Sequence, residues 1–431
     1  MNNAESLTDA TMHILLWGSL FAILIFVSYR RYIVSIFDPL NVQAISQVAA
    51  CVVAVEVVDD PRMLMQLFAS QVAFIVGFRL VRPFKTAQGT VGWKKQDMDK
   101  AAMVVGGLFL IILLANCWLG LTAGFPLFAR DPSIAKVENF TGGLGLVRRL
   151  NSGAGTFLSV SSLVLAIKGH YRRLFTCIFA VSLAVAILGG AKGSLLAAVE
   201  LIAYLTCRHD VVSEGAGRQL RIVSYCLFVL GTLLAVFILR ASSNSWNDAG
   251  VALATRVMFF GDAVIYYYRP EVIQMLSHLG PWDYMTSLLN PVLGFFRLVE
   301  YQYPIGYQIV SFLNGEYLSV VQGPNTPFYV GGHIYFGSVG GIIYSGSVGY
   351  IVSRARRWYL TGAAVTPFRL SCSCTMAILI FVLPVEAPLF VSEVFDTFLP
   401  VMMIAGVVTL AFYSVHPRLP KIASNETAFG N

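Results

Sequence analysis

Charge is scarce in this sequence. Asp, Glu, Lys and Arg together make up 12% of the 431 residues, whereas hydrophobic residues make up 57%. The mean hydropathy is +0.70. A soluble globular domain carries about 25% charged residues, so this composition excludes a chain whose whole surface is solvated. We expect an integral membrane protein that exposes apolar side chains to lipid.

Motifs for metals, nucleotides and disulfide scaffolds are also missing. None of the seven cysteines belongs to a CxxC pair, and the six histidines are scattered along the chain. The sequence contains neither a P-loop nor a GxGxxG motif. We therefore expect no metal ion, no cofactor and no use of ATP, and any substrate must arrive already activated.

Long apolar runs recur along the chain. Most have about 17 to 20 residues, near the length needed to cross the ~30 Å hydrocarbon core of a bilayer as a helix. They predict an all-α, polytopic protein with about eleven membrane-spanning helices in one membrane domain, residues 1–431. The expected spans are 11–29, 41–58, 62–80, 101–120, 152–168, 174–189, 193–207, 222–240, 329–352, 370–387 and 397–414.

The basic residues predict the orientation of these spans. If alternate loops are assigned to one side, twenty of the thirty Lys and Arg residues gather there, and most acidic residues lie on or near the other side. Cytoplasmic loops are rich in Lys and Arg, so we expect a periplasmic N-terminus and a cytoplasmic C-terminus. The net charge of +7 then reflects membrane topology. No Arg-rich arm or reading module indicates a nucleic-acid partner.

Two segments on the acidic side are too long to be simple turns. They cover residues 120–153 and 241–328, and we expect them to form periplasmic loops, the larger one with amphipathic helices. The larger loop holds sixteen aromatic residues. These rings are typical of an interfacial belt, and they also suit a platform on which sugars stack. The candidates for a glycan groove are Tyr266, Tyr267, Trp282, Arg297 and Tyr301.

Charged residues within the larger loop allow two interpretations each. The stretch 251–270 predicts an amphipathic helix that ends at Pro270, with Asp262 and Arg269 on one face. Arg297 and Glu300 have the spacing of an ordinary helical ion pair. Arg240 suits a snorkelling anchor at the end of a span as well as it suits a ligand.

The stretch GPNTPFYVGGHIYFGSVGGIIYSGSVGYIVSRARR, residues 323–357, is unusually rich in glycine. Small residues at this density favour close contact between helices in lipid. His333 lies just inside the start of the predicted span. An ionisable side chain there requires a partner or a water-filled cavity, so His333 is a candidate site residue.

Several of these blocks resemble a known family. GFPLFARDPSIAKVENFTGGLGLVRRL at 124–150, GGAKGSLL at 189–196, the long outer loop and GGHIYFGSVGG at 331–341 are similar to the O-antigen and polysaccharide polymerases of bacteria. The resemblance implies an inner-membrane glycosyltransferase. Its substrates are oligosaccharide repeat units linked to undecaprenyl pyrophosphate, and a separate chain-length regulator is an expected partner. It implies no metal ion.

The resemblance also implies roles for particular residues. Lys192 occupies the position in GGAKG at which family members commonly carry a basic residue, so it is a candidate for binding pyrophosphate. His333 is the first candidate for the base that deprotonates the acceptor hydroxyl, and Asp262 is the second. The remaining cations expected to bind pyrophosphate are Arg240, Arg256, Arg148 and Arg149.

Two other functions also fit these sequence features. An O-antigen ligase, which transfers finished glycan to the lipid A core, shares the expected architecture and uses a large outer loop with basic residues and a histidine. A flippase for lipid-linked oligosaccharides is also helical and basic. The aromatic outer loop and the lack of an evident internal repeat argue against a flippase.

Overall fold

In the structure, a computed structural model, helices account for all the regular secondary structure of the residues that it describes. These are residues 3–83, 92–129, 135, 144–168, 171–189, 194–241, 258–315, 323–362 and 366–415, and none of them forms a strand. The predicted all-α class is confirmed.

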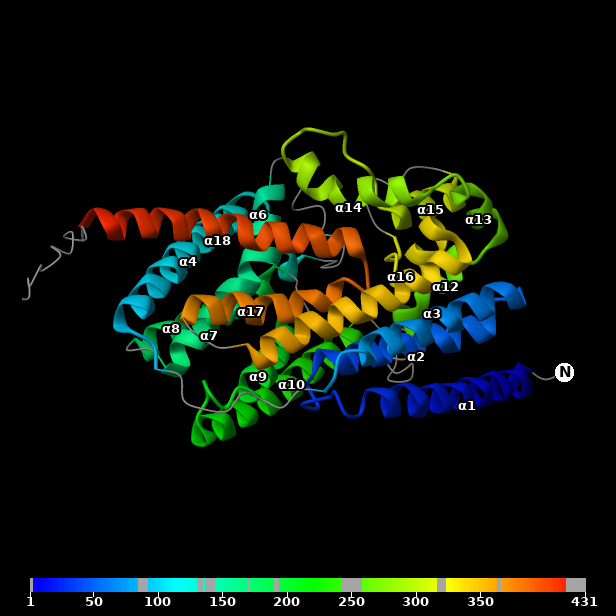
Figure 1. Cartoon of the computed structure of the whole chain (residues 1–431), viewed down its shortest axis with the longest axis horizontal. Helices are drawn as coiled ribbons and strands as arrows, with labels where there is room; N and C mark the ends of the chain where they lie inside the picture. Colours follow the sequence, from blue (N-terminus) through cyan, green and yellow to red (C-terminus); the bar gives the residue numbers. More distant parts are fainter. Residues whose placement is uncertain are drawn as a thin grey trace, which may run out of the picture.

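Eleven of the helices form an elongated bundle, and each overlaps one of the predicted spans (Figure 1). The amino end of the first helix and the carboxyl end of the last lie at opposite ends of the bundle (Figure 1). These helices are α1 (Asn3–Tyr29), α2 (Pro39–Val57), α3 (Pro61–Arg79), α4 (Lys95–Thr122), α7 (Gly155–Lys168), α8 (Arg172–Leu188), α9 (Ser194–Thr206), α10 (Glu214–Ala241), α16 (Phe328–Thr361), α17 (Pro367–Leu379) and α18 (Ala387–Val415).

Only some of these helices are long and apolar enough to cross a membrane by length and composition. Among the described residues, four stretches qualify: Pro39–Val57, Pro61–Arg79, Lys95–Phe128 and Ala387–Ala411. Other apolar helices are shorter, such as Gly155–Lys168. The structure therefore supports a membrane protein with several spanning helices, and the count of eleven stays a prediction.

Apolar side chains on the outside of the bundle support the same conclusion. Leu15 and Ile23 of α1 are 63% and 62% exposed, and Met402 and Val407 of α18 are 59% and 67% exposed. Contiguous apolar faces of this kind are rare on soluble monomers. In a bilayer they contact lipid tails at no cost.

Glycines bring α3 and α16 into backbone contact. A Cβ atom on Gly77 of α3 would lie 1.9 Å from the carbonyl oxygen of Gly346, and one on Gly349 of α16 would lie 2.1 Å from that of Phe74. No larger residue fits at these positions without separating the helices. The predicted packing role of the glycine-rich stretch is confirmed at these contacts.

The predicted span 329–352 is not one continuous helix. Gly337 interrupts α16 with φ 67° and ψ −173°, a conformation that is essentially restricted to glycine. The chain bends so sharply there that a Cβ on Gly341 would lie 2.7 Å from the carbonyl carbon of Gly332. The sequence predicted the span 329–352 without this break, because a positive φ cannot be read from a pattern in which glycine also serves packing.

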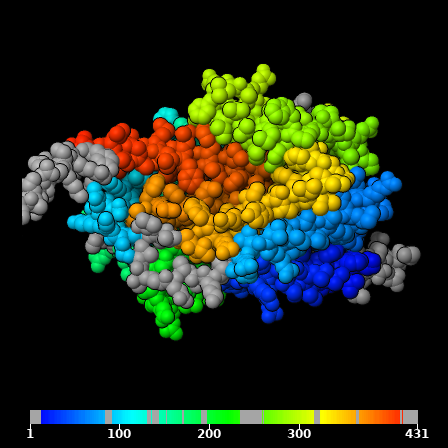
Figure 2. Space-filling view, viewed as in Figure 1, coloured from blue at the N-terminus to red at the C-terminus, as the bar shows by residue number. Residues whose placement is uncertain are grey.

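A layer of short helices covers the end of the bundle where α2 joins α3 and continues along one side of it (Figures 1 and 2). It comprises η3 (Phe259–Gly261), α12 (Asp262–Tyr267), α13 (Pro270–Leu276), α14 (Pro281–Phe295) and α15 (Ile305–Asn314), and we call it the loop-helix layer. It confirms that the larger predicted loop contains helices.

Two local expectations for this layer are wrong. Pro270 begins α13 and does not end a long helix, because proline fits the first helical position, where no N–H partner is needed. Arg297 lies beyond the end of α14 with φ 56°, so it and Glu300 are not one turn apart on a helix. Residues 251–257 of the predicted amphipathic helix lie outside the described residues.

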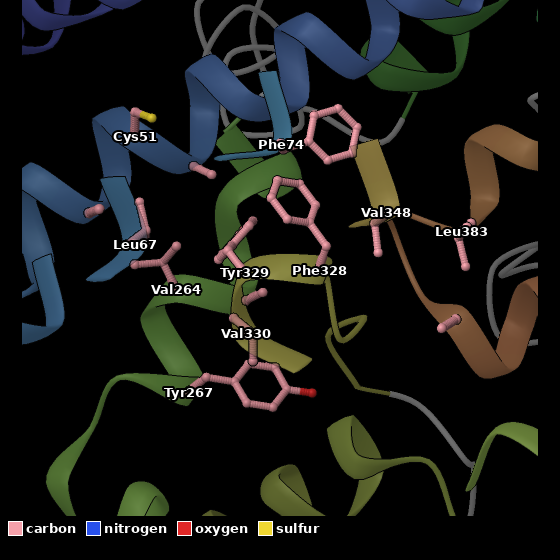
Figure 3. Close-up of a cluster of buried hydrophobic side chains, with 14 of the residues drawn as sticks. Cys51, Leu67, Phe74, Val264, Tyr267, Phe328, Tyr329, Val330, Val348 and Leu383 are labelled. Atoms are coloured by element: carbon pink, nitrogen blue, oxygen red, sulfur yellow. The ribbon is translucent and has the colours of Figure 1, made fainter. Parts of the chain in front are cut away.

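Aromatic and aliphatic packing joins the loop-helix layer to the bundle. The ring of Phe328 stacks on that of Phe74 with centroids 4.6 Å apart, and Val264 and Tyr267 of α12 belong to the same buried cluster (Figure 3). Burying side chains of this size stabilises the arrangement by roughly 1.5–3 kcal/mol each. The layer is therefore held firmly over the start of α16.

The other long segment, which follows α4, contains η1 (Pro126–Phe128), α6 (Gly145–Arg149) and one π-helical turn, η2 (Leu150–Ala154). Single π-helical turns are often found at functional sites. Asn151 in this turn exchanges two hydrogen bonds, of 2.7 and 2.9 Å, with Asn116 of α4. The turn therefore fixes the direction in which α6 leaves the bundle.

Candidate functional site

A cavity of about 350 Å³ lies between the loop-helix layer and the start of α16. Tyr267 and Tyr268 line it from α12 and the turn after it, Ile273 and Leu276 line it from α13, and His333 lines it from α16. Ligand pockets typically combine apolar walls with a few convergent polar groups. The cavity has this character, and we call it the histidine cavity.

The break in α16 places His333 on the wall of this cavity. His333 lies four residues before Gly337, and the ring of Tyr268 stacks on its imidazole with centroids 6.4 Å apart. Its buried Nδ1 atom has no hydrogen-bond partner. A buried polar atom without a partner costs free energy, so the imidazole is held on the cavity wall by packing and not by a hydrogen bond at this nitrogen.

Hydrogen bonds fix the two cavity tyrosines. The hydroxyl of Tyr268 donates to Oε1 of Gln66 at 3.0 Å, and Nε2 of Gln66 donates to Ser70 at 3.0 Å. The hydroxyl of Tyr267 lies 2.9 Å from Oγ1 of Thr326, in the segment that leads into α16. The cavity wall is thus preorganised by α3 and by the segment before α16.

Glu386 lies beside the cavity, in the turn between η4 (Ile380–Val382) and α18. This turn is attached to the start of α16, because the backbone N–H of Phe328 donates to the carbonyl of Pro384 at 3.1 Å. Burial raises the pKa of Glu386 to about 7. Its carboxyl has no ion pair and no side-chain hydrogen bond within the described parts of the chain. A carboxyl of this kind gains or loses a proton near neutral pH.

Two arginines of α6 lie near α14 and α18. Arg149 forms a 3.0 Å ion pair with Asp396 of α18, and its guanidinium lies 5.3 Å from the ring centroid of Phe295. Arg148 precedes it on α6 and is exposed. The charges of both arginines act on Tyr301. We call these residues, Arg148, Arg149, Tyr301 and Asp396, the arginine cluster.

The charge of Glu386 influences tyrosine pKa values in both the histidine cavity and the arginine cluster. It acts on Tyr267 and Tyr335 of the cavity wall, and also on Tyr301 of the cluster. Tyr301 continues into a row of rings, because Tyr303 lies 5.4 Å from it and Tyr307 stacks 4.8 Å further on. Cations, a titratable carboxyl, a histidine and aromatic rings therefore share one region under the loop-helix layer.

The structure places the other candidates outside the cavity wall. Asp262 begins α12 and packs with η3 against α2, and burial raises the pKa of its carboxyl. Its charge acts on Tyr267. Tyr266 packs under the guanidinium of Arg269 at 6.0 Å, and Trp282 at the start of α14 is 82% exposed. Arg297, also exposed, is not among the residues that line the histidine cavity.

Three predicted cations are not tested by this geometry. Lys192 and Arg256 lie outside the described residues. Arg240 belongs to α10, but its side chain lies outside what the structure describes. Arg148 and Arg149 are the predicted pyrophosphate ligands whose side chains the structure describes, and they belong to the arginine cluster.

Glu386 and Tyr268 were not among the site residues predicted from the sequence. Glu386 lay at the end of a predicted span, and its position in a turn depends on α17 ending at Leu379 and on η4. A usable signal was present, because Pro384 and Pro388 flank the glutamate and disfavour a continuous helix. Within the described ranges, no group of three His, Cys, Asp or Glu side chains is placed to hold a metal ion.

Comparisons with protein-family models, with curated proteins and with solved structures find no match for this chain.

Proposed function

We propose that the protein is a glycosyltransferase of the bacterial inner membrane that polymerises oligosaccharide repeat units linked to undecaprenyl pyrophosphate. In this proposal eleven spans cross the membrane, the N-terminus and the loop-helix layer face the periplasm, and the C-terminus faces the cytoplasm. The product is an O-antigen or a related polysaccharide. The proposal rests on the resemblance of the sequence blocks and on the arrangement of the candidate site.

One observation carries the proposal furthest. His333 lines a mostly apolar cavity beside the break in α16, and the charges of Glu386, Arg148 and Arg149 all act on the pKa of Tyr301 in the adjoining arginine cluster. A base beside an apolar cavity, together with cations a short distance away, suits the transfer of a sugar from a lipid pyrophosphate. Interrupted helices elsewhere in membrane proteins also line substrate sites.

The reaction assigns a role to each group. The hydroxyl of the acceptor sugar loses its proton to His333, and its oxygen attacks the anomeric carbon of the donor glycan. The bond from that carbon to the pyrophosphate oxygen breaks with inversion. The electron pair leaves with undecaprenyl pyrophosphate, whose growing negative charge the arginine cluster stabilises. Glu386 is a second proton acceptor, and Tyr301, Tyr303 and Tyr307 provide rings for the glycan.

Proton transfer by a positioned base contributes roughly 10²–10⁴-fold to a rate. Loss of the imidazole of His333 should therefore abolish visible polymer. Loss of Arg148 alone should weaken binding of the donor without removing the base. These two effects separate the roles of the histidine cavity and the arginine cluster.

The proposal can be tested from the lipopolysaccharide gel profile of a deletion strain. The strain is complemented with wild type, His333→Ala, Arg148→Gln or the control Trp118→Ala, at matched expression in the membrane; Trp118 lies on α4, is 60% exposed and belongs to no candidate site. A polymerase predicts that deletion collapses the ladder to core plus one repeat unit, and that His333→Ala does not restore it.

Other patterns would reject the proposal. Core without any repeat unit, together with carrier-linked polymer in the membrane, identifies a ligase that transfers glycan to lipid A core. Core without any repeat unit, and without carrier-linked polymer in the membrane, identifies a flippase. A ladder that His333→Ala restores as fully as wild type shows that His333 is not the base.

A further inference from the structure

A second cavity lies away from the candidate site, between the α1–α2 loop and the start of α10. Its volume is about 810 Å³, and it is bounded by the loop between α1 and α2, the carboxyl end of α9 and the first turns of α10. The rings of Tyr225 and Phe228 on α10 lie 5.3 Å from that of Phe37 and hold the loop in place. The proposed function uses no residue of this cavity, which we call the α10 pocket.

The α10 pocket carries a net positive charge. Arg218 and Arg221 of α10 line it with His209, and all three are exposed, while Glu214 is the acidic residue on its wall. Neither arginine forms an ion pair with another described residue. Glu214 and Gly215 open the 28-residue helix α10 at the same pocket, so the positive end of the helix dipole adds to the charge.

An apolar stripe leaves the pocket along the outer face of α10. Ile222, Tyr225, Val229 and Leu233 follow Arg218 at helical spacing and are 58%, 54%, 54% and 61% exposed. A stripe of this kind on a membrane helix contacts acyl chains. The two arginines lie at the end of the stripe, where the headgroup of a lipid on that stripe is positioned.

We propose that the α10 pocket binds the phosphate headgroup of an anionic phospholipid whose acyl chains lie on the Ile222–Leu233 face of α10. The fork-shaped guanidinium groups of Arg218 and Arg221 match the geometry of phosphate oxygens. The volume of the pocket leaves room for a headgroup in addition to water. This proposal does not depend on the reaction proposed for the histidine cavity.

Native mass spectrometry of the full-length protein in detergent tests the proposal. Delipidated protein is titrated with phosphatidylglycerol or with phosphatidylcholine, and retained lipid is counted. Each basic residue near an anionic lipid contributes about fivefold in affinity. We therefore expect Arg218→Gln/Arg221→Gln to bind phosphatidylglycerol about 25-fold more weakly than wild type, with little change for phosphatidylcholine.

A matched control uses Arg172→Gln/Arg173→Gln at the start of α8. These arginines are also adjacent to an apolar helix and exposed, and they lie outside the α10 pocket. We expect this variant to bind phosphatidylglycerol as wild type does. An equal loss of affinity for phosphatidylglycerol in both double variants would show general charge attraction and overturn the proposal. Unchanged affinity in both double variants would overturn it as well.

Inorganic phosphate distinguishes a lipid from a soluble anion. If the stripe on α10 contributes, 10-fold molar excess of phosphate over phosphatidylglycerol does not displace the bound lipid. Displacement by phosphate would show that the pocket takes a free anion and would overturn the assignment to a phospholipid. Thermal unfolding supplies a second readout, because phosphatidylglycerol raises the Tm of wild type more than that of Arg218→Gln/Arg221→Gln.

Discussion

Replacing Gly337 by alanine tests whether the break in α16 is required for the candidate site. The backbone there has φ 67° and ψ −173°, and a Cβ atom would meet nothing within 4 Å. The cost of the substitution therefore comes from backbone conformation alone and not from a clash. Strain of this type costs about 1–3 kcal/mol.

Gly106→Ala is the matched control. Gly106 lies inside α4, and a Cβ atom there also meets nothing within 4 Å. Alanine at a compatible helical position stabilises a protein by about 0.4–1 kcal/mol. The two variants should therefore differ in unfolding free energy by roughly 1.5–4 kcal/mol, the sum of these two effects.

The assay is thermal unfolding of both purified variants in the same detergent, followed by tryptophan fluorescence. We expect Gly337→Ala to unfold at a lower temperature than wild type and Gly106→Ala at an equal or higher one. Gly337→Ala should also fail to restore the polysaccharide ladder, because a straighter α16 moves His333 away from the cavity. If Gly337→Ala were as stable and as active as Gly106→Ala, the argument that the break positions His333 would be refuted.

Three further predictions follow from individual contacts. The pKa of Glu386 is about 7 against an ordinary 4.5, so its neutral form stabilises the fold below pH 4.5 and that stability is lost as pH rises through 7. Denaturation should show that the unfolding free energy of wild type is lower at pH 8 than at pH 5 by on the order of 3 kcal/mol, whereas that of Glu386→Gln does not change over this range. An equal decrease in both proteins would contradict the burial of Glu386. Arg149→Gln leaves Asp396, 8% exposed, without its ion-pair partner, and should cost about 1–3 kcal/mol in unfolding free energy. The double variant with Asp396→Asn should recover part of this cost, and a strictly additive result would exclude the coupling. Gly349→Ala should lower the yield of folded protein, because its Cβ would lie 2.1 Å from the carbonyl oxygen of Phe74; a normal yield and size-exclusion profile would contradict the α3–α16 contact.

The all-helical class and the position of each long helix follow from the apolar runs, because hydrophobicity and length are local properties of a sequence. The packing role of glycine in 323–357 was also readable, since small residues favour close helix contact. The break at Gly337 was not, because glycine density alone does not reveal which glycine adopts a positive φ.

Among the site residues, too, those with a local sequence signal could be predicted and those that depend on the tertiary fold could not. His333 was recognisable because a histidine within an apolar run requires a cavity or a partner, and the structure places it on a cavity wall. Glu386 was not recognisable, since its neighbours are Tyr267, Tyr301 and Tyr335, which lie between 51 and 119 residues away in the chain. Such long-range proximity is a property of the tertiary fold.

Reconstitution tests the central claim most directly. Wild type and His333→Ala are incorporated into proteoliposomes with carrier-linked repeat units extracted from the deletion strain, and the glycan products are separated by length. We predict that wild type alone converts single repeats into a ladder of carrier-linked oligomers and releases undecaprenyl pyrophosphate. Single repeats that remain unchanged with wild type, or a ladder of equal intensity with His333→Ala, would contradict the proposal that the histidine cavity polymerises lipid-linked glycan.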